Sequence, residues 1–457
     1  MRKLAFVLIG MVVVLSALWL ASRALPPTDT EREALTLLSS PPTFEGSNAF
    51  PTLWLMLYDV PAEEQAAVMA ADIDAHWPRQ AAPWAEGYAG SIVSGAAADY
   101  RELRPDEEDR QLFCRSSAGS CLDQVRADPD QIRELVSRHS ALLDRIASLA
   151  DHDYVQNLFP PELLFPSPSL QVNLYTKTLH ALNFVDGDID QALAGTCRDL
   201  KTWRRVGTNS DTLLMRMIGQ AFESRNFAPL LADMLAELPP GHPLPEACLG
   251  LARTAEVDDL SICLPMRGEF QFIKATTQNL DFRNDPGADT LSKRWRNRIH
   301  SLFFRPDASM ARVAPHYAQW CGERLRNAVI ADDPDPDLLE LPSRISFRCL
   351  GNWAGCLLAD LSLTAPSAYH VRHLDYGAYR RALAALIWLQ QQGNDSGYGD
   401  TFASLPAELQ SQTRPLRLDL ESASIRVELY HTAEHPDFSL PLPGSRFTPD
   451  QTSATFQ

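Results

Sequence analysis

Two histidines and an aspartate lie close enough in the sequence to hold a metal ion. His370, His373 and Asp375 fall at the expected start of a helix, where such spacing can gather side chains on one side. Neutral imidazoles three residues apart can share a zinc ion. A polar first turn of an exposed helix explains the same residues as well. They stay weak metal-ligand candidates, and we expect no cofactor.

A second histidine motif stands near the carboxyl end. His431-Thr432-Ala433-Glu434-His435 has the H-x-x-E-H spacing of an inverted zinc peptidase. That chemistry needs both imidazoles on one helical face, with the glutamate acting as base. Here the motif follows an expected strand and runs directly into Pro436. A polar turn after a hairpin is the better interpretation.

Three alternating aspartates imitate the start of a calcium loop. Asp186, Asp188 and Asp190 have the right spacing, but Gln191 and Cys197 stand where an EF-hand needs glycine and glutamate. Acidic residues in a turn also cap the next helix and interact favourably with its dipole. We therefore expect a capped turn. The chain also lacks a G-x-S-x-G elbow and a dinucleotide fingerprint, so its motifs assign no reaction.

One basic segment stands out from an acidic chain. It combines cationic residues with nearby aromatic rings at Trp295, Phe303 and Phe304. Such a mixture suits anionic lipid headgroups or an acidic protein face, although a helix with an exposed cationic face and aromatic rings in the core fits as well. The candidate contact residues are Lys293, Arg294, Trp295, Arg296, Arg298 and Arg305.

The cysteine pattern favours an oxidising compartment. An even number of cysteines, eight, follows an apolar segment of the kind that directs export. Two pairs share C-x6-C spacing and a third pair is close in sequence, so we expect three local bridges and assign the fourth by elimination. Free thiols are the alternative. The expected bridges are Cys114–Cys121, Cys248–Cys263, Cys349–Cys356 and Cys197–Cys321.

An uncharged apolar stretch runs from Leu4 to Ala21 behind Arg2 and Lys3. Eighteen residues of helix reach roughly 27 Å, close to the thickness of a bilayer's hydrocarbon core. The basic pair predicts a cytoplasmic start, with the bulk of the chain on the other side. A cleaved signal peptide is the alternative, with its site near Ser22-Arg23-Ala24. The stretch is long for a signal peptide, so we favour an uncleaved anchor in the inner (plasma) membrane, with the bulk in the periplasm.

The elements that would position these residues are mainly helical. Apolar residues at steps of three and four follow Asp128-Pro129 as far as Leu149, and similar patterns occupy 189–206, 227–238 and 376–392. Alternating Leu416, Leu418 and Leu420, followed after a turn by Ile425, Val427 and Leu429, predict a β-hairpin. The predicted fold is a mainly α, irregular array of helical hairpins with a carboxyl-terminal β-hairpin, preceded by one transmembrane helix.

The expected divisions follow composition and period. They are an anchor over 1–24, a juxtamembrane stalk over 25–50, an exported helical domain over 51–400, a β-hairpin region packed on it over 401–440, and a frayed tail over 441–457.

Charge and composition narrow the function without naming it. With 41 basic and 58 acidic residues, the chain carries a formal charge of −17 and repels phosphate backbones, so nucleic acid is a poor partner. We expect a membrane-anchored envelope protein with a structural or interaction role, whose partner is another envelope protein. The alternatives are an envelope hydrolase, with or without a metal ion, and a lipid- or ligand-binding module.

Overall fold

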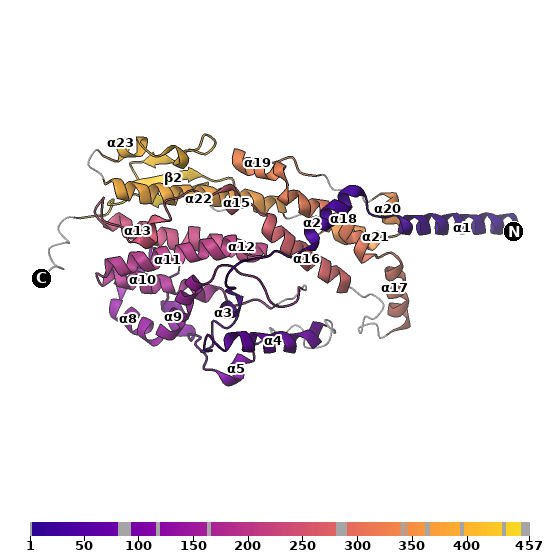
Figure 1. The fold of residues 1–457 in the computed structure, drawn as a ribbon, viewed down its shortest axis with the longest axis horizontal. Coiled ribbons are helices and arrows are strands. Elements are labelled where there is room, and N and C mark those ends of the chain that lie inside the picture. Colours follow the sequence, from indigo (N-terminus) through magenta and orange to yellow (C-terminus); the bar gives the residue numbers. More distant parts are fainter. Residues whose placement is uncertain are drawn as a thin grey trace.

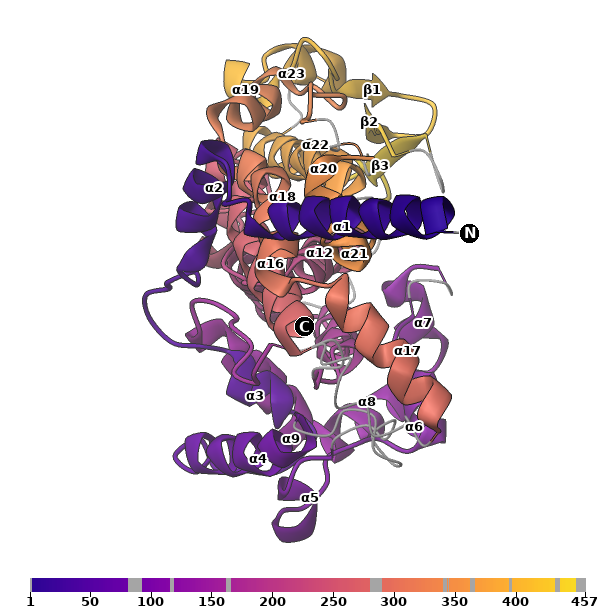
Figure 2. The same cartoon turned by 90° about the vertical axis from the view of Figure 1, so that its right-hand side faces the viewer.

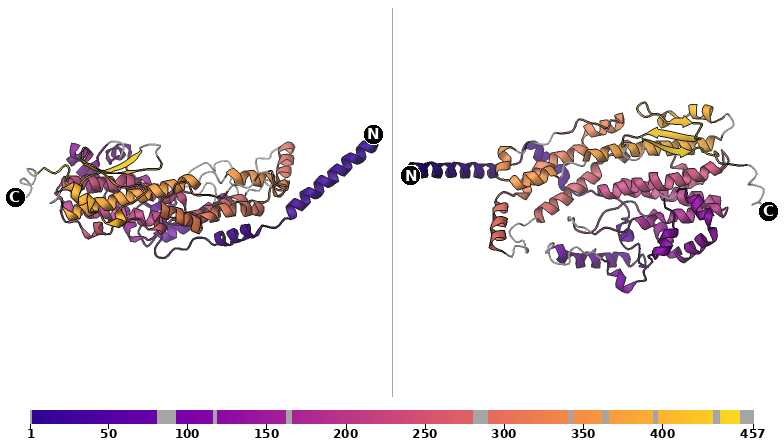
Figure 3. Two further views of the ribbon diagram at one scale, coloured as in Figure 1. Left: turned by 90° about the horizontal axis from the view of Figure 1, so that it is seen from above. Right: turned by 180° about the vertical axis from the view of Figure 1, so that it is seen from behind.

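Helices form most of the computed structural model, as the apolar periodicity predicts (Figure 1). The structure describes residues 2–80, 93–115, 119–161, 166–279, 290–339, 343, 345–361, 366–393, 397–431 and 436–448. The helix α1 projects from one end of the body, and the carboxyl end lies at the other (Figures 1 and 3).

The first part of the chain alternates short helices with turns. Its elements are α1 (Arg2–Ala24), α2 (Asp29–Ser39), α3 (Phe50–Trp54), α4 (Gln65–Gln80), α5 (Ala96–Asp99), α6 (Glu107–Leu112), α7 (Cys121–Ala127), α8 (Pro129–Arg138), α9 (Ser140–Ala147), η2 (Ser148–Asp151), η3 (Gln171–Leu174), α10 (Thr176–Val185) and α11 (Ile189–Thr208).

Longer helices and a small sheet follow. These are α12 (Leu213–Phe222), the π-helical η4 (Glu223–Phe227), α13 (Ala228–Glu237), α14 (Glu246–Leu249), α15 (Val257–Leu260), α16 (Cys263–Asn279), α17 (Leu291–Leu302), α18 (Pro306–Ala318), η5 (Gln319–Cys321), α19 (Glu323–Ala331), α20 (Phe347–Leu350), α21 (Trp353–Leu361), α22 (Pro366–Gln392), α23 (Tyr398–Ala403), η6 (Ala407–Leu409), β1 (Arg417–Asp419), β2 (Ser424–Glu428) and β3 (Asp437–Pro441).

Local sequence signals explain where several helices begin and break. The Asp128 carboxylate accepts a hydrogen bond from the Gln131 N–H at 3.1 Å and caps α8, whose first residue is Pro129. The stripe predicted as one helix to Leu149 is interrupted at His139, where α8 ends and α9 begins. The imidazole there lies 2.7 Å from the Asp109 carboxylate of α6. This tertiary contact coincides with the break, which periodicity did not reveal.

The buried apolar residues form two separate clusters. The large core includes Trp203, Phe227 and Leu386 and draws on α3 to α14, α22 and the sheet. The small core includes Phe270 and Val313 and draws on α2, α16, α18 and α19. Figure 1 shows α2, α16 and α18 of the small core between α1 and the helices α11 and α13 of the large core. In Figure 2, α16 lies between α1 and the large-core helices α3, α4 and α9. The predicted single helical domain over 51–400 therefore has two centres of burial.

The predicted stalk is part of the body. Its helix α2 packs against α18 and α16, and Ala34 and Leu38 lie in the small core. The Gln271 side chain of α16 donates to the Leu38 carbonyl. The predicted juxtamembrane stalk over 25–50 therefore contains a helix whose apolar face is buried, and the segment packs on the domain instead of separating the domain from α1.

A third strand joins the predicted hairpin. The strands β1 and β2 pair antiparallel with Leu418 opposite Ile425, and β3 pairs antiparallel with β2. The sheet packs on α22, with the Tyr379 and Phe438 rings 4.4 Å apart. The expected fraying from residue 441 is wrong as far as 448: the Gly444 N–H donates to the Leu235 carbonyl of α13 at 2.9 Å.

The disulfide pattern corrects half of the predicted pairing. The structure contains Cys114–Cys121 and Cys349–Cys356, as the spacing predicts. The predicted pairs Cys248–Cys263 and Cys197–Cys321 are wrong; the observed bridges are Cys197–Cys248 and Cys263–Cys321. Cys248 is buried in the large core beside Cys197, whereas Cys263 follows Ile262 of the small core. Cys248 and Cys263, although close in sequence, therefore belong to different cores. The bridge Cys197–Cys248 lies in the large core, and Cys263–Cys321 lies beside the small core.

Two glycines let α11 and α12 approach closely. A Cβ on Gly219 would lie 2.6 Å from the Gly207 Cα and 2.9 Å from the Trp203 carbonyl oxygen, both on α11. Gly399 of α23, by contrast, has no neighbour within 4 Å of such a Cβ and is exposed.

We expect Gly219→Ala to lower the free energy of unfolding by about 1–3 kcal/mol, because the methyl group must push two backbones apart. Denaturant unfolding of the full chain in detergent measures the change. Gly399→Ala is the control and should be neutral or stabilising by up to about 1 kcal/mol. Equal effects of both substitutions would contradict the close approach.

Two carboxylic acids meet where the two cores join. Asp211 accepts from the Asn157 N–H at 3.2 Å, and Glu269 of α16 accepts from the Leu213 N–H at 3.0 Å. Burial raises the pKa of Asp211 to about 7, and the negative charge of Glu269 adds to this rise. Burial also raises the pKa of Glu269.

Stability should therefore respond to pH through Asp211. Between its unfolded pKa near 4 and its folded pKa near 7, the folded chain binds more protons than the unfolded chain, so stability falls as pH rises. We expect wild type to lose about one kcal/mol per pH unit relative to Asp211→Asn across this window. Unfolding curves at pH 4, 5.5, 7 and 8 test this. A difference between the two proteins that does not vary with pH would refute it.

Candidate membrane-facing site

The helix α1 has the composition of a membrane span. Its stretch Phe6–Ala24 is long and apolar enough to cross a bilayer, and nearly all of it is exposed in the protein. Exposed leucine, isoleucine and valine side chains surround the helix over most of its length. A helix that is apolar all round is typical of a membrane span or of a buried core helix, and α1 is not buried.

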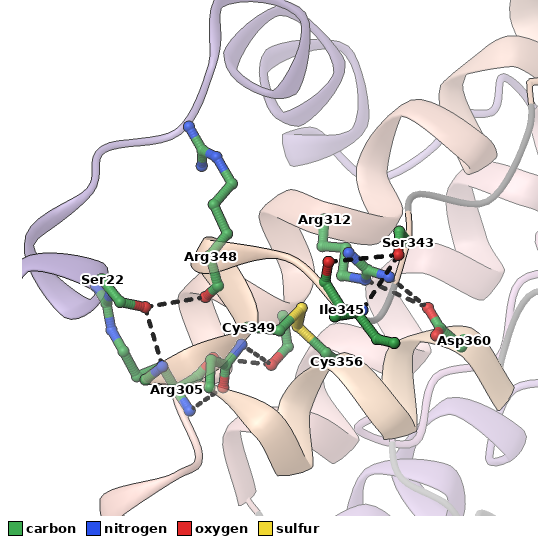
Figure 4. Close-up of a disulfide and its surroundings, with 12 residues drawn as sticks. Ser22, Arg305, Arg312, Ser343, Ile345, Arg348, Cys349, Cys356 and Asp360 are labelled. Carbon is green, nitrogen blue, oxygen red and sulfur yellow. Dashed lines mark hydrogen bonds and ion pairs between the residues drawn. A yellow bond between two sulfur atoms is a disulfide. The ribbon is translucent and has the colours of Figure 1, made fainter. Parts of the chain in front are cut away.

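The last turn of α1 is joined to the body by polar contacts. The Ser22 hydroxyl accepts from the Gly351 N–H at 2.9 Å and is buried. The Arg23 guanidinium donates to the carbonyls of Leu302 at 2.5 Å and Gly351 at 3.2 Å. In return, the Arg305 guanidinium donates to the Arg23 carbonyl. Figure 4 shows Ser22, Arg305 and Arg348 around this joint. The joint fixes the direction in which α1 leaves the body.

A disulfide and a buried side-chain amide hold the segment around Gly351, to which the last turn of α1 is bonded. Cys349–Cys356 connects α20 to α21 (Figure 4). Asn352 lies in the short segment between these two helices. The Asn352 amide oxygen accepts from the Arg305 N–H at 2.6 Å at the start of α18, and its NH2 donates to the Ser309 hydroxyl at 3.1 Å. The amide therefore ties α18 to the segment that carries Gly351.

A hollow of about 240 Å³ opens beside the same disulfide. Its lining includes Arg305, Arg312 and Arg348. Acidic partners offset two of these charges: Asp360 lies 2.9 Å from Arg312, and Glu31 lies 3.3 Å from Arg348. The lining surface of the hollow is thus mainly apolar with nearly balanced charges, and the hollow adjoins the base of α1.

The helix α17 lies at the same end of the body. It runs crosswise to α1 (Figures 1 and 3). The Phe303 ring, directly after α17, meets the Trp19 indole of α1 edge-on, with centroids 6.5 Å apart. The neighbouring α20 and α21 add exposed Phe347 and Trp353. Apolar side chains therefore gather on the end from which α1 emerges.

The structure separates the members of the predicted basic segment. Arg294, Trp295 and Arg298 are exposed on α17. Lys293 and Arg296 belong to the same helix, but their side chains lie outside the described part of the protein. Arg305 lies beyond α17 and donates to the α1 joint. Phe303 is partly exposed, and Phe304 is buried.

The three candidate metal ligands do not point to a common centre. The His370 Nε2 lies 2.8 Å from the Asp333 carbonyl, and the His373 Nδ1 lies 2.7 Å from the Tyr369 carbonyl. Asp375 accepts from the Arg414 guanidinium at 2.6 Å. Among the residues that the structure describes, no three His, Cys, Asp or Glu side chains are placed to hold a metal ion.

These residues instead belong to buried polar contacts along α22. The Arg216 guanidinium donates to His373 Nε2 at 3.2 Å. Burial lowers the pKa of His373 well below its usual value, and the charge of Arg216 lowers it further, so the ring is neutral. Nearby, the Glu223 carboxylate accepts from Arg204 at 2.7 Å and from the Tyr376 hydroxyl. Such charges, paired across helices, favour one packing arrangement.

Asp375 organises the region of the second histidine motif. Its carboxylate accepts from the N–H groups of Tyr430 and His431 at 2.8 and 2.9 Å. Arg414 also donates to the Asp332 carboxylate and so ties the segment that begins at Asp332 to the body. The rest of the histidine motif, 432–435, lies outside the described residues. Ion pairs between residues so far apart in the sequence produce no local sequence pattern. Arg414 was therefore not predicted as a partner of Asp375.

Comparison of the chain with protein-family models, with curated proteins and with solved structures finds no match. The geometry of the end from which α1 emerges is therefore the main evidence on function.

We expect Asn352→Ala to cost about 1–3 kcal/mol of stability, because it leaves the partly buried Arg305 N–H without its side-chain acceptor and removes the donor to the Ser309 hydroxyl. A spin label near the end of α1 should also gain mobility as the joint loosens. Gln412→Ala removes an exposed amide and is the control, with a change within about 0.5 kcal/mol. An unchanged label mobility in Asn352→Ala would contradict the supporting role of the amide.

Proposed function

We propose that this chain is a single-pass protein of the inner (plasma) membrane, with its amino terminus in the cytoplasm and its helical domain in the periplasm. In this role α1 anchors the domain and holds it in a fixed direction. The domain serves a structural or interaction role toward another protein of the cell envelope.

The joint at the end of α1 carries the proposal. A signal peptide is cut away, so its last residues need no contacts with the mature protein. Here the expected cleavage region contains the buried Ser22 hydroxyl and the Arg23 guanidinium, both bonded to the body. Cleavage after Ala24 would remove these contacts and leave Gly351 and Arg305 without them. The arrangement favours an uncleaved anchor.

The disulfides support the compartment. Cys197–Cys248 and Cys263–Cys321 close long loops, and all eight cysteines belong to the four bridges. Reducing cytoplasm keeps such thiols free, whereas exported proteins retain their bridges. An oxidising space on the far side of the α1 membrane accounts for both features.

The alternatives differ in what supports them. An envelope hydrolase built on His370, His373 and Asp375 conflicts with their divergent partners. A lipid- or ligand-binding role is the second candidate, favoured by the hollow at the base of α1, where Leu25 and Ala308 lie beside Arg305. Its mainly apolar lining with a few charged groups would suit part of a lipid or another mostly apolar ligand.

Fractionation of native cells tests the anchor and the compartment. We expect intact chain, with its first residues retained, to stay in the membrane pellet after alkaline carbonate extraction. We also expect its cysteines to resist alkylation until a reductant is added. A soluble pool of intact chain, a mature form that starts near residue 25, or alkylation of all cysteines without reductant would overturn the proposal.

Crosslinking from the native membrane tests the interaction role. Crosslinked complexes purified through the full chain should contain another envelope protein in stoichiometric amount. A variant with Arg23→Ala and Arg305→Ala, which loosens the joint but keeps the apolar helix, is the matched control and should recover less of it. Recovery of no stoichiometric partner would count against the interaction role while leaving the anchor intact.

A further inference from the structure

The exposed face of α17 is the apolar one. Leu291, Trp295, Ile299 and Leu302 are 75%, 61%, 49% and 47% exposed, whereas Asn297 is buried. At about 100° per residue, the four apolar residues span roughly 80° of the helix, and Asn297 lies roughly 200° from their centre. A helix on a protein in water normally buries such a stripe and exposes its polar side. The stripe of α17 therefore points away from the body, toward a different neighbour.

The position of α17 indicates which neighbour that is. Its last residue, Leu302, accepts from Arg23 of α1, and the next residue, Phe303, contacts Trp19. If α1 spans the membrane, Trp19 lies at the headgroup layer, where indoles concentrate. The carboxyl end of α17 is then at the same depth. Because α17 runs crosswise to α1 (Figure 1), the whole helix lies along the membrane surface.

The charge of α17 matches a bilayer with anionic lipids. The segment Leu291–Leu302 contains four Lys and Arg residues and no acidic residue, in a chain whose formal charge is −17. Arg294 and Arg298 are exposed and flank one side of the apolar stripe. Each basic residue near an anionic membrane surface strengthens binding about fivefold. An anionic membrane surface repels the acidic remainder of the chain, so its electrostatic attraction for α17 orients the domain with α17 toward the lipid.

We propose that α17 is an interfacial helix. Its apolar stripe enters the acyl–headgroup boundary of the membrane that α1 crosses, and Arg294 and Arg298 bind anionic headgroups. Exposed Phe347 and Trp353 beside α1 extend the contact. The inference rests on the proposed anchor: α1 brings the domain to the membrane, and α17 sets how the domain sits on it.

A probe placed on the stripe reports its surroundings. All eight native cysteines are in disulfides, so Ile299→Cys can carry an environment-sensitive fluorophore on the full chain. Leu420→Cys is the matched control, an exposed leucine on the hairpin turn. Both proteins are placed in nanodiscs made either of zwitterionic lipid alone or of a mixture in which about one lipid in three is an anionic phospholipid.

We expect the probe at 299 to emit at shorter wavelength in anionic nanodiscs, to be quenched by lipid-borne nitroxide and to be protected from aqueous iodide. The probe at 420 should be quenched by iodide in every membrane. A chain that stays in the nanodisc while its probe at 299 is as open to iodide as the probe at 420 overturns the inference and leaves the anchor intact. A chain that does not enter the nanodisc overturns the anchor itself.

Charge reversal separates lipid from a protein partner. In anionic nanodiscs, Arg298→Glu should lower the ratio of lipid-protected to exposed probe by about fivefold or more, and high salt should lower it in wild type as well. Arg417→Glu on β1 is the charge-matched control and should have no effect. An equal loss with both variants overturns the inference. Protection that rises with protein concentration and ignores lipid composition also overturns it, because a second copy would then cover the stripe.

Discussion

The direction of α1 is fixed by a few hydrogen bonds between its last turn and the body. Ser22 and Arg23 bind the backbone at Leu302 and Gly351, and Arg305 binds back to α1. A Cβ on Gly351 would lie 2.4 Å from the Arg23 Cγ, so the side chain packs directly over the backbone there. These contacts link α1 to α17, α18 and α20 at once. If α1 is the proposed membrane anchor, a flexible linker would leave the domain free to tumble, whereas this joint would give it one fixed face toward the lipid.

Sequence patterns predicted where helices form better than they predicted which elements pack against one another. Apolar residues at helical steps located α11, α13 and most of α22. Burial leaves this pattern in the sequence, along one stripe of α11 and on nearly all sides of α13 and of the second half of α22. The break at His139 had no such signal, because it involves Asp109 on another helix. The strand β3 was missed because only Phe438 and Leu440 mark it, beyond a polar turn. The stalk was misjudged because Ala34 and Leu38 form too short a stripe to show that they are buried.

The sequence predicted which segments contribute to the candidate site, but it did not predict how these segments are placed in space. The sequence indicated the apolar start and the basic aromatic segment near residue 295, which lie far apart along the chain. That Phe303 meets Trp19 depends on how the small core packs, and no local pattern encodes it. The metal candidates failed for the same reason: His373 and Asp375 each found a distant arginine, Arg216 and Arg414, as partner. Hydrogen bonds and ion pairs between residues far apart in the sequence cannot be predicted from the spacing of apolar residues.

Every disulfide joins a cysteine to the next one along the chain. The pairs are 114 with 121, 197 with 248, 263 with 321, and 349 with 356, and no bridge encloses or crosses another. If the chain is exported as proposed, residues emerge in order from the end of α1 onward, and each bridge can close before the next two thiols arrive. Oxidation in that order would produce the native set without an enzyme that reshuffles wrong pairs.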